Sequence, residues 1–328
     1  MQVHRDINNL PNFKNAAVTI GTFDGVHTGH LQIFNQLIKE ATDNNGESVI
    51  ITFHPHPRMV IQSLKKNNRE KSSIKLLNTF AEKIELLAKY KIDHLVVVPF
   101  TKEFSEQAPE EYISGFLVSK FHPQTIIIGY DHHFGKDRKG DYKLLEKYQQ
   151  QHNYTVKEIP EHVLHHVTIS STKIREALTS GDIQTANEYL GYDYFFQGKV
   201  IDGNKLGRNL GYPTANILID DPDKLVPAYG VYAVTVSLGT ESDQPVPAFV
   251  PEAGFKGMMN IGTRPTIGDN KIMIEVNIFD FNRDIYGRIL RVYVKKYMRP
   301  EIKFNDLEEL KIQLGKDEKE ARKILLEF

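Results

Sequence analysis

Apolar residues in the first half of the chain follow two alternating patterns. Short runs rich in Val and Ile, which are typical of buried strands, lie at residues 18–20, 49–53, 95–99, 125–129 and 155–159. Apolar residues recur at helical spacing over residues 31–41, 79–90, 110–121 and 142–152. Strands that alternate with helices predict an α/β domain whose parallel sheet is covered on both faces.

The second half has a different pattern. After a short helical stretch at 183–190, strand-like runs follow one another at 195–201, 230–238, 257–262, 272–281 and 289–297. Strands without intervening helices predict an all-β domain, an antiparallel barrel or sandwich. Residues 305–328 predict one amphipathic helix that packs on the barrel. We therefore expect two domains, residues 1–186 and residues 187–328.

Composition narrows the class of protein. The 328 residues include 41 basic and 42 acidic side chains, and a net charge of -1 gives no general attraction to nucleic acid or membranes. The chain contains no cysteine, no apolar run long enough to span a membrane and no signal-peptide core. We expect a cytoplasmic monomer or weak homo-oligomer that acts on small molecules. All 13 histidines lie in the first half, between His4 and His166.

The first candidate site lies between the first strand and its helix. Residues 21–30 read Gly-Thr-Phe-Asp-Gly-Val-His-Thr-Gly-His, and the glycines allow a close approach of backbone to ligand. His27 and His30 stand where the helix begins, and the first N–H groups of a helix attract anions. The stretch therefore predicts a site for a nucleotide triphosphate.

Two other interpretations of this histidine pair remain open. The imidazoles could simply cap a turn, or they could bind a metal ion. A zinc site would need further ligands, and without cysteine these would have to be carboxylates or other histidines.

Two later stretches in the first half also follow predicted strands. Residues 54–58, His-Pro-His-Pro-Arg, contain two prolines that argue against a helix there, and we expect this loop to lie near the site. Residues 129–135, Gly-Tyr-Asp-His-His-Phe-Gly, follow another strand. The carboxyl ends of parallel strands are where such sheets bind their ligands.

A second phosphate-binding element is predicted at residues 169–175, Ile-Ser-Ser-Thr-Lys-Ile-Arg. Ser or Thr before a helical pattern is first of all an N-cap signal. Hydroxyl groups and free N–H groups at the start of a helix, with Arg175 about one turn later, can also bind phosphate.

The candidate chemistry of the second half lies at residues 207–216, Gly-Arg-Asn-Leu-Gly-Tyr-Pro-Thr-Ala-Asn. In an extended chain Thr214 and Asn216 point to one face, and their oxygens are hard ligands suited to Mg²⁺ with ATP phosphates. A turn followed by an ordinary strand is the alternative. Glu275 shares a strand face with Asn277, where a carboxylate could take a proton from an alcohol or simply face solvent.

The motifs of the first half resemble the nucleotidyltransferase superfamily, and GTFDGVHTGH with ISSTKIR resembles its FMN adenylyltransferase module. The resemblance implies a Rossmann-like domain in which His27, His30 and Arg175 act on ATP. It also implies nucleotide or flavin contacts at the following residues: Gly21, Phe23, Asp24, Gly25, Gly29, Ser171 and Thr172. GYDHHFG is similar to the family loop GxDFRFG, which implies contacts by Asp131 and Phe134. His132 and His133 depart from that pattern.

In the second half, GRNLGYPTAN, YGVYAV, NIGTRPT and EVNIFDF occur in the order seen in riboflavin kinases. This resemblance implies that Thr214 and Asn216 hold Mg²⁺ with ATP and that Glu275 is the catalytic base. It also implies a flap over the phosphates at residues that include Gly207, Arg208, Gly211, Tyr212 and Pro213. Residues 248–256 form a connection longer than the pattern requires, with no assigned function.

Together the modules resemble the prokaryotic bifunctional FAD synthetase family. The resemblance implies ATP-dependent phosphorylation of riboflavin to FMN, followed by adenylylation of FMN to FAD with release of pyrophosphate. Two alternatives are a cytidylyltransferase for a small phosphorylated alcohol, which leaves the second half unexplained, and a flavin-sensing binding protein.

Overall fold

The computed structural model describes residues 1–65, 74–159, 169–203, 206–239, 254–263 and 272–328. Residues 204–205, 248–253 and 264–266, which belong to motifs considered above, lie outside the described residues. The chain divides into two compact units, Met1–Ser170 and Ser171–Phe328.

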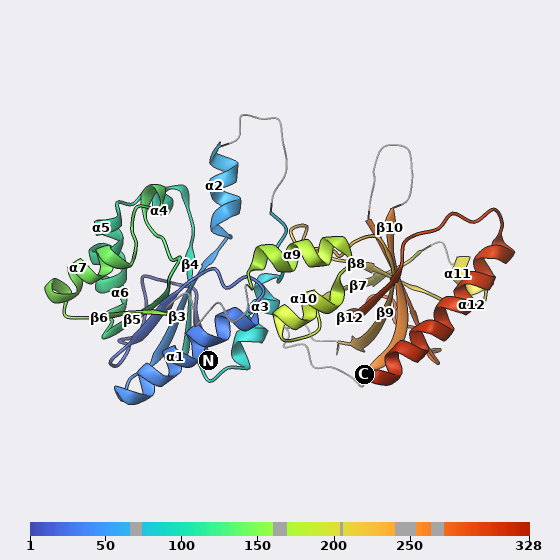
Figure 1. Cartoon of the computed structure of the whole chain (residues 1–328), viewed down its shortest axis with the longest axis horizontal. Coiled ribbons are helices and arrows are strands. Elements are labelled where there is room, and N and C mark those ends of the chain that lie inside the picture. The colour runs from blue at the N-terminus through green and yellow to red at the C-terminus, as the bar shows by residue number, and fades with distance from the viewer. Residues whose placement is uncertain (66–73, 160–168, 204–205, 240–253, 264–271) are drawn as a thin grey trace. The chain divides into compact units, whose positions relative to one another are not determined.

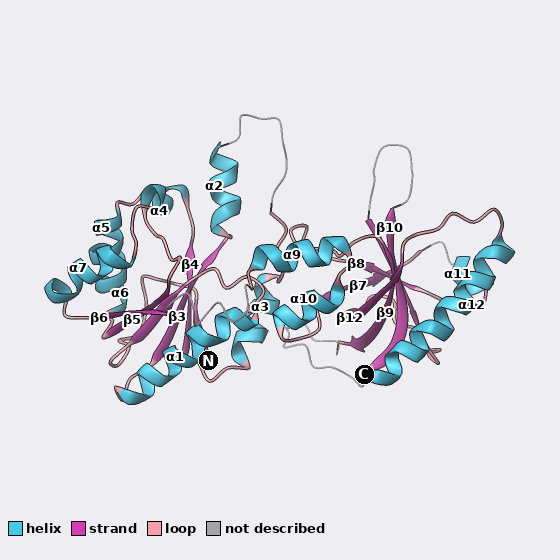
Figure 2. Ribbon diagram, in the orientation of Figure 1, coloured by secondary structure: helices cyan, strands magenta, loops and turns pink. Residues whose placement is uncertain are grey.

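The first unit is built on a six-stranded parallel sheet, as predicted (Figures 1 and 2). Its strand order is β1-β4-β3-β2-β5-β6, and every described pairing is parallel. The strands are β1 (Gln2–His4), β2 (Ala17–Ile20), β3 (Ser48–His54), β4 (His94–Pro99), β5 (Thr125–Gly129) and β6 (Thr155–Ile159).

Helices cover both faces of this sheet. One face buries Val18 and Ile20 against a cluster that includes Phe116 and Leu145. The opposite face packs against the helix that carries Phe34, which is fully buried. The helical segments are α1 (Thr28–Asp43), α2 (Pro57–Lys65), α3 (Phe80–Ala88), α4 (Lys102–Ser105), α5 (Pro109–Glu111), the π-helix η1 (Tyr112–Val118), α6 (Ser119–Phe121), η2 (Lys136–Arg138) and α7 (Tyr142–His152).

Two local features differ from the expectation. The prediction that no helix occurs at residues 54–58 is wrong for its last two residues, because α2 begins at Pro57. Proline lacks only an N–H that the first helical turn leaves unpaired, so it is well tolerated there. The helix expected at 110–121 is present, but its middle is the π-helix η1.

The second unit is a closed antiparallel barrel with strand order β10-β11-β8-β7-β12-β9 (Figure 2). Its strands are β7 (Phe195–Ile201), β8 (Ala215–Leu218), β9 (Gly230–Leu238), β10 (Phe255–Thr263), β11 (Ile272–Ile278) and β12 (Ile289–Arg299). The strand expected at 272–281 ends at Ile278, because the chain turns where Asp280 adopts a φ of 55°.

Helices precede and follow the barrel strands in the sequence, and one short helix lies between β7 and β8. They are α9 (Ser171–Ser180), α10 (Ile183–Leu190), α11 (Leu206–Asn209), α12 (Leu307–Ile324) and the final turn η3 (Leu325–Glu327). The expectation that the last helix packs on the barrel is confirmed: Ala321 and Leu325 are buried against Ala233, Met258 and Phe279. At the other end, the N–H of Ala228 donates to the carbonyl of Leu178 on α9 at 3.0 Å.

Within the part of the chain that is described, we find no helix whose length and apolar character would let it cross a membrane.

Leu325 and Leu326 provide a matched test of the contact between the last helix and the barrel. Leu325 is fully buried, whereas Leu326 is 80% exposed. Replacing Leu325 by Ala should lower the free energy of unfolding of the barrel by about 2–5 kcal/mol, the cost of removing buried apolar volume. Replacing Leu326 by Ala should change it by less than about 0.5 kcal/mol. Hydrogen exchange of β9 and β10 peptides measures both, and equal protection in the two variants would contradict this packing.

Candidate functional site

The loop between β2 and α1 leaves the sheet at the carboxyl end of β2 and turns sharply. Phe23, Gly25 and Val26 have φ values of 45°, 89° and 39°, all in the left-handed region. This conformation is rare for a β-branched residue such as valine. Strain of this kind costs about 1–3 kcal/mol per residue and persists where surrounding contacts enforce it, often at ligand sites. The backbone therefore marks the predicted motif as a candidate site.

The two histidines of this motif lie together at the start of α1. His27 is the N-cap residue, and its backbone N–H donates to Nδ1 of His30 at 3.2 Å. Their rings stack with centroids 3.6 Å apart. The first N–H groups of a helix lack partners within the helix, so an anion bound here can accept hydrogen bonds from backbone and imidazole.

His30 is kept in its neutral form. Burial, and then the nearby His27 and Lys83, hold the pKa of His30 well below its usual value of 6.5. Because Nδ1 of His30 accepts a hydrogen bond, the proton of the neutral ring is on Nε2. A bound phosphate would favour the charged imidazolium and raise this pKa.

Two glycines of the motif are required by close packing. A Cβ atom on Gly21 would lie 2.8 Å from the Phe23 ring, and one on Gly29 would lie 3.1 Å from Nδ1 of His27. The same Cβ on Gly29 would lie 3.6 Å from the carbonyl oxygen of Ile169. Ile169 is the first residue of ISSTKIR, so this motif begins beside the start of α1.

The other residues of ISSTKIR that were singled out lie on the first turns of α9, which belongs to the second unit. Ser171 and Arg175 are half-buried, and Thr172 is exposed.

Phe23 and Asp24 have their side chains inside the protein. The Phe23 ring packs edge-on against His30, with centroids 5.2 Å apart. The Asp24 carboxylate, 2% exposed, accepts hydrogen bonds from the N–H groups of Leu77 at 3.1 Å and Asn78 at 3.4 Å. Both side chains therefore shape the loop from within.

The loop after β5 begins next to the histidine loop, because β5 pairs with β2. Asp131 in this loop is exposed, whereas Phe134 is buried and stacks on Tyr112 with centroids 4.9 Å apart. Phe134 also exchanges two backbone hydrogen bonds with Gly140. Phe134 thus anchors the loop in the core, and Asp131 is the accessible residue of the pair.

Residues 54–58 follow β3 at the same edge of the sheet. The His54 ring packs against Phe80 with centroids 4.7 Å apart, and His56 is buried. Among the residues that the structure describes, no group of three or more His, Asp or Glu side chains is placed to hold a metal ion.

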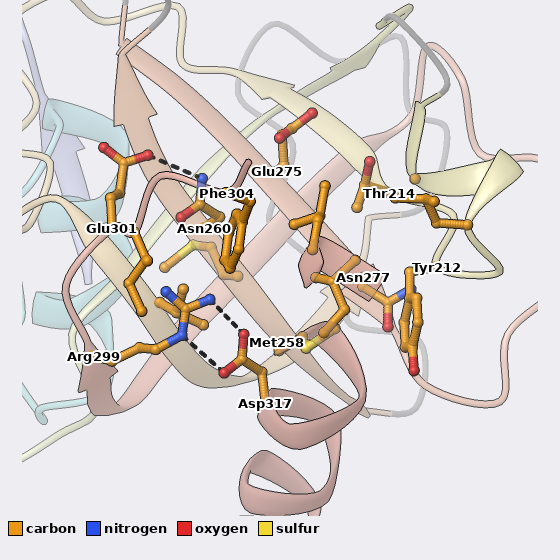
Figure 3. A pocket seen from close by; sticks show the side chains of 17 residues that line it. Tyr212, Thr214, Met258, Asn260, Glu275, Asn277, Arg299, Glu301, Phe304 and Asp317 are labelled. Carbon is orange, nitrogen blue, oxygen red and sulfur yellow. Dashed lines mark hydrogen bonds and ion pairs between the residues drawn. The ribbon is translucent and has the colours of Figure 1, made fainter. Parts of the chain in front are cut away.

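The barrel contains a pocket of about 220 Å³ (Figure 3). It is lined by Gly207, Leu210, Tyr212, Thr214, Val231, Met258, Met259, Asn260, Glu275, Asn277, Arg299, Glu301, Ile302, Phe304, Leu310, Leu314 and Asp317. The lining combines an apolar interior with a few polar groups, which is typical of small-molecule sites.

Strand register places the predicted polar residues of the barrel on one face. Glu275 on β11 pairs with Asn216 on β8 and with Asn260 on β10. Directly paired residues of antiparallel strands have side chains on the same face, so a carboxylate lies between two amides. Thr214 precedes β8 and shares the pocket with Glu275, while Ala215 and Ile217 are buried as alternation predicts.

The predicted flap is a compact turn. The N–H of Tyr212 donates to the carbonyl of Gly207 at 2.8 Å, and Gly211 has a φ of 88°. The amide of Asn277 donates to the carbonyl of Pro213 at 2.7 Å, which ties the end of the turn to β11. Arg208 is exposed. The turn is thus joined to the strand that carries Glu275.

An ion pair that the sequence did not indicate lies at the other side of the pocket (Figure 3). Arg299, near the end of β12, donates to both carboxylate oxygens of Asp317 on α12, at 2.9 and 2.6 Å. Gln313 also donates to Asp317, at 2.8 Å. Asp317 is 1% exposed. These contacts hold α12 beside the pocket that its Leu310 and Leu314 line.

Sequence reasoning missed Arg299 and Asp317 because each occurs singly in an ordinary strand or helix pattern. Asp317 is one of several acidic residues on a highly charged helix, where such a residue is normally solvated. Its pairing with a strand residue is a tertiary contact, for which spacing along the chain contains no signal.

Family models match both halves of the chain. The model described as FAD synthetase matches residues 10–173, and the model described as riboflavin kinase matches residues 190–325. The second match removes the main support for a cytidylyltransferase, which would leave that half unexplained.

Curated relatives match over nearly the full length. A bifunctional riboflavin kinase/FMN adenylyltransferase of Listeria monocytogenes is 36% identical over 309 residues, covering 94% of this chain and 92% of that protein. Proteins of the same description from Haemophilus influenzae and Escherichia coli are 35% and 33% identical and cover 98% of this chain.

A solved structure has the same fold. It is described as a macrolide-efflux protein from Streptococcus pneumoniae, with a TM-score of 0.83 and 28% identity over 98% of both chains. Since both family models and the full-length relatives agree, this chain belongs to the family of bifunctional riboflavin kinase/FMN adenylyltransferases, which convert riboflavin to FMN and FMN to FAD.

Proposed function

We propose that the two reactions use the two sites described above, with riboflavin phosphorylated in the barrel and FMN adenylylated at the histidine loop. The observation that carries the assignment is that Glu275 lines the barrel pocket with Thr214 and pairs across the strands with Asn216, which is not itself among the lining residues. It puts a carboxylate beside oxygen ligands, which suits phosphoryl transfer to an alcohol.

In the kinase site, Glu275 accepts the proton of the terminal ribityl hydroxyl of riboflavin. The hydroxyl oxygen then attacks the γ-phosphorus of ATP, the bond to the β-phosphate oxygen breaks, and ADP leaves. The flap at residues 207–213 covers the phosphates. The ion pair between Arg299 of β12 and Asp317 of α12 holds α12 beside the pocket in which the flavin is proposed to bind.

Thr214 and Asn216 are the proposed residues for Mg²⁺. Their hydroxyl and amide oxygens are hard ligands that fit this ion together with ATP phosphates, while the Glu275 carboxylate across the strand pair is the base. When bound, the ion neutralises charge on the phosphate oxygens.

In the adenylyltransferase site, an oxygen of the FMN phosphate attacks the α-phosphorus of ATP, and the bond to pyrophosphate breaks. We propose that His27 and His30, with Ser171, Thr172 and Arg175, hold the phosphates and stabilise charge on the leaving pyrophosphate. The glycines at 21, 25 and 29 let the chain approach the nucleotide, and Asp131 lies on the neighbouring loop.

The proposed functional boundary stays at residues 186/187, later in the chain than the boundary between the two compact units. The stretch between the two boundaries comprises α9 and the first half of α10; α9 contains residues proposed for the first site, while its Leu178 carbonyl accepts a hydrogen bond from Ala228 of the second unit. Its contacts place α9 in the second unit, whereas its proposed function places it with the first domain.

We further propose that the enzyme acts in the cytoplasm as a monomer or weak homo-oligomer and binds no nucleic acid. The net charge of -1 and the absence of cysteine support this setting.

Replacing Glu275 by Gln should lower kcat for FMN formation about 10²–10⁴-fold, because the amide cannot accept the proton. Conversion of supplied FMN to FAD should stay at the wild-type rate. The measurement is chromatographic separation of flavins after incubation with ATP and Mg²⁺. Loss of both reactions in a folded protein would refute the division of labour.

Replacing Asn216 by Ala should raise the Mg²⁺ concentration for half-maximal kinase activity about 10–100-fold, the usual cost of a lost partner at a metal site. Titrating Mg²⁺ at fixed ATP measures the change. The exposed Leu218 of the same strand, replaced by Ala, is the control. An unchanged Mg²⁺ requirement in the Asn216 variant would assign the ion to other residues.

Replacing His30 by Ala should slow FAD formation about 10²–10³-fold, as expected when one group that stabilises developing charge is removed. Riboflavin phosphorylation should continue normally in the same preparation. His152, at the end of α7, is a matched histidine whose replacement by Ala should leave both rates unchanged. Wild-type FAD formation by the His30 variant would place adenylyl transfer elsewhere.

A further inference from the structure

The strained loop between β2 and α1 is held from outside by residues near the start of α3. Its residues Phe23, Gly25 and Val26 are all in the left-handed region, so the loop needs contacts that fix its path. Leu77 and Asn78 supply two of them by donating their N–H groups to the Asp24 carboxylate.

The third contact comes from Lys83, on the first turns of α3. Its Nζ donates to the carbonyl oxygen of Thr22 at 2.8 Å. The hydroxyl of Thr52, on β3, donates to the same oxygen at 3.4 Å. The last carbonyl before the strained residues is therefore held between a helix and a strand.

Lys83 is an unusual residue for this position, since its side chain is only 6% exposed. Lysine is almost never fully buried unless it is paired. Burial lowers the pKa of Lys83, and the Asp24 carboxylate opposes this shift. An apolar residue would fill the same space without the free-energy cost of removing a charged ammonium group from water. We therefore infer that the Lys83 ammonium group does more than fill space.

The charge of Lys83 also acts on the histidine pair. The groups that lower the pKa of His30 are burial, then His27, then Lys83. Asp24 is the acidic group that faces Lys83 in turn. The lysine thus contributes positive potential next to the proposed phosphate site and favours the neutral form of His30 before ATP binds.

We propose that Lys83 is a positioning residue for adenylyl transfer. Its hydrogen bond to Thr22 holds the strained loop that places His27 and His30, and its charge tunes His30. This inference rests on the proposed function, in which these histidines act on the phosphates of ATP.

The test uses the full-length chain with Lys83 replaced by Met, which keeps the length of the side chain and removes the donor and the charge. We expect kcat for FAD formation to fall about 100-fold, the order of effect of a misplaced catalytic group, with a much smaller change in the KM for ATP. Riboflavin phosphorylation in the same preparation should be unchanged. The exposed Lys89 at the end of α3, replaced by Met, should leave both reactions unchanged.

A second readout does not depend on activity. NMR titration of the histidine rings, with the His30 signal assigned from its absence in the His30→Ala variant, should show a higher pKa for His30 in Lys83→Met than in the wild type. Lys83→Gln keeps a donor without the charge. It should raise the same pKa while retaining more FAD formation than Lys83→Met.

The outcomes separate the two proposals. Wild-type kcat for FAD formation and an unmoved His30 titration in Lys83→Met would overturn the role of Lys83. If Lys83→Met does not fold, the same two results in Lys83→Gln would overturn it. If His30→Ala itself forms FAD normally, the proposed function fails, whereas the shift in the His30 titration would still report the electrostatic contact with Lys83.

Discussion

The alternation of side chains along hydrogen-bonded strands is the constraint on which both sites depend. In the barrel, pairing of β11 with β8 and β10 fixes Glu275 between two asparagines. A slip of one residue would turn every side chain of β11 to the other face and remove the carboxylate from the pocket. In the α/β unit the parallel pairing of β2 and β5 has a similar effect, because it brings two loops to the same edge of the sheet.

The two proposed sites would bind phosphate with different kinds of residue. The histidine loop uses imidazoles at the start of a helix, in a place buried enough to keep His30 neutral. In the proposed kinase site the oxygen atoms of Thr214 and Asn216 suit a hard cation. Neutral imidazoles can donate hydrogen bonds directly to a negatively charged phosphate. Acceptor oxygen atoms of the protein cannot, so a cation must lie between them and the phosphate.

The spacing of apolar residues predicted a helix or strand well where the pattern within that segment was enough to define it. The strand at 125–129 has the expected bounds because it is a continuous apolar run. The helix at 142–152 also has its expected bounds, and it is followed by Asn153 in the left-handed conformation. The helix that starts at Pro57 was missed. Proline disrupts the interior of a helix, but it is also favoured in the first turn, where α2 has it. Lys83 lies three residues after Phe80 and four before Leu87, but a lysine in a helix is normally solvated, and only the tertiary fold brings it to Thr22. Phe134 shows the opposite case, a motif residue whose ring belongs to the core.

The hydrogen bond from Asn277 to the carbonyl of Pro213 ties one end of the proposed nucleotide-binding turn to β11. Residues before Pro213 are joined to one another through the bond from Tyr212 to Gly207, and the Tyr212 ring packs beside the cluster that contains Met258 and Ala321. Residues after it continue directly into β8. A swing of this turn to admit ATP or release ADP would therefore pivot upstream of Pro213, and Thr214 would keep its place throughout the cycle. The proposed Mg²⁺ ligand Thr214 would then stay in place while the turn moves.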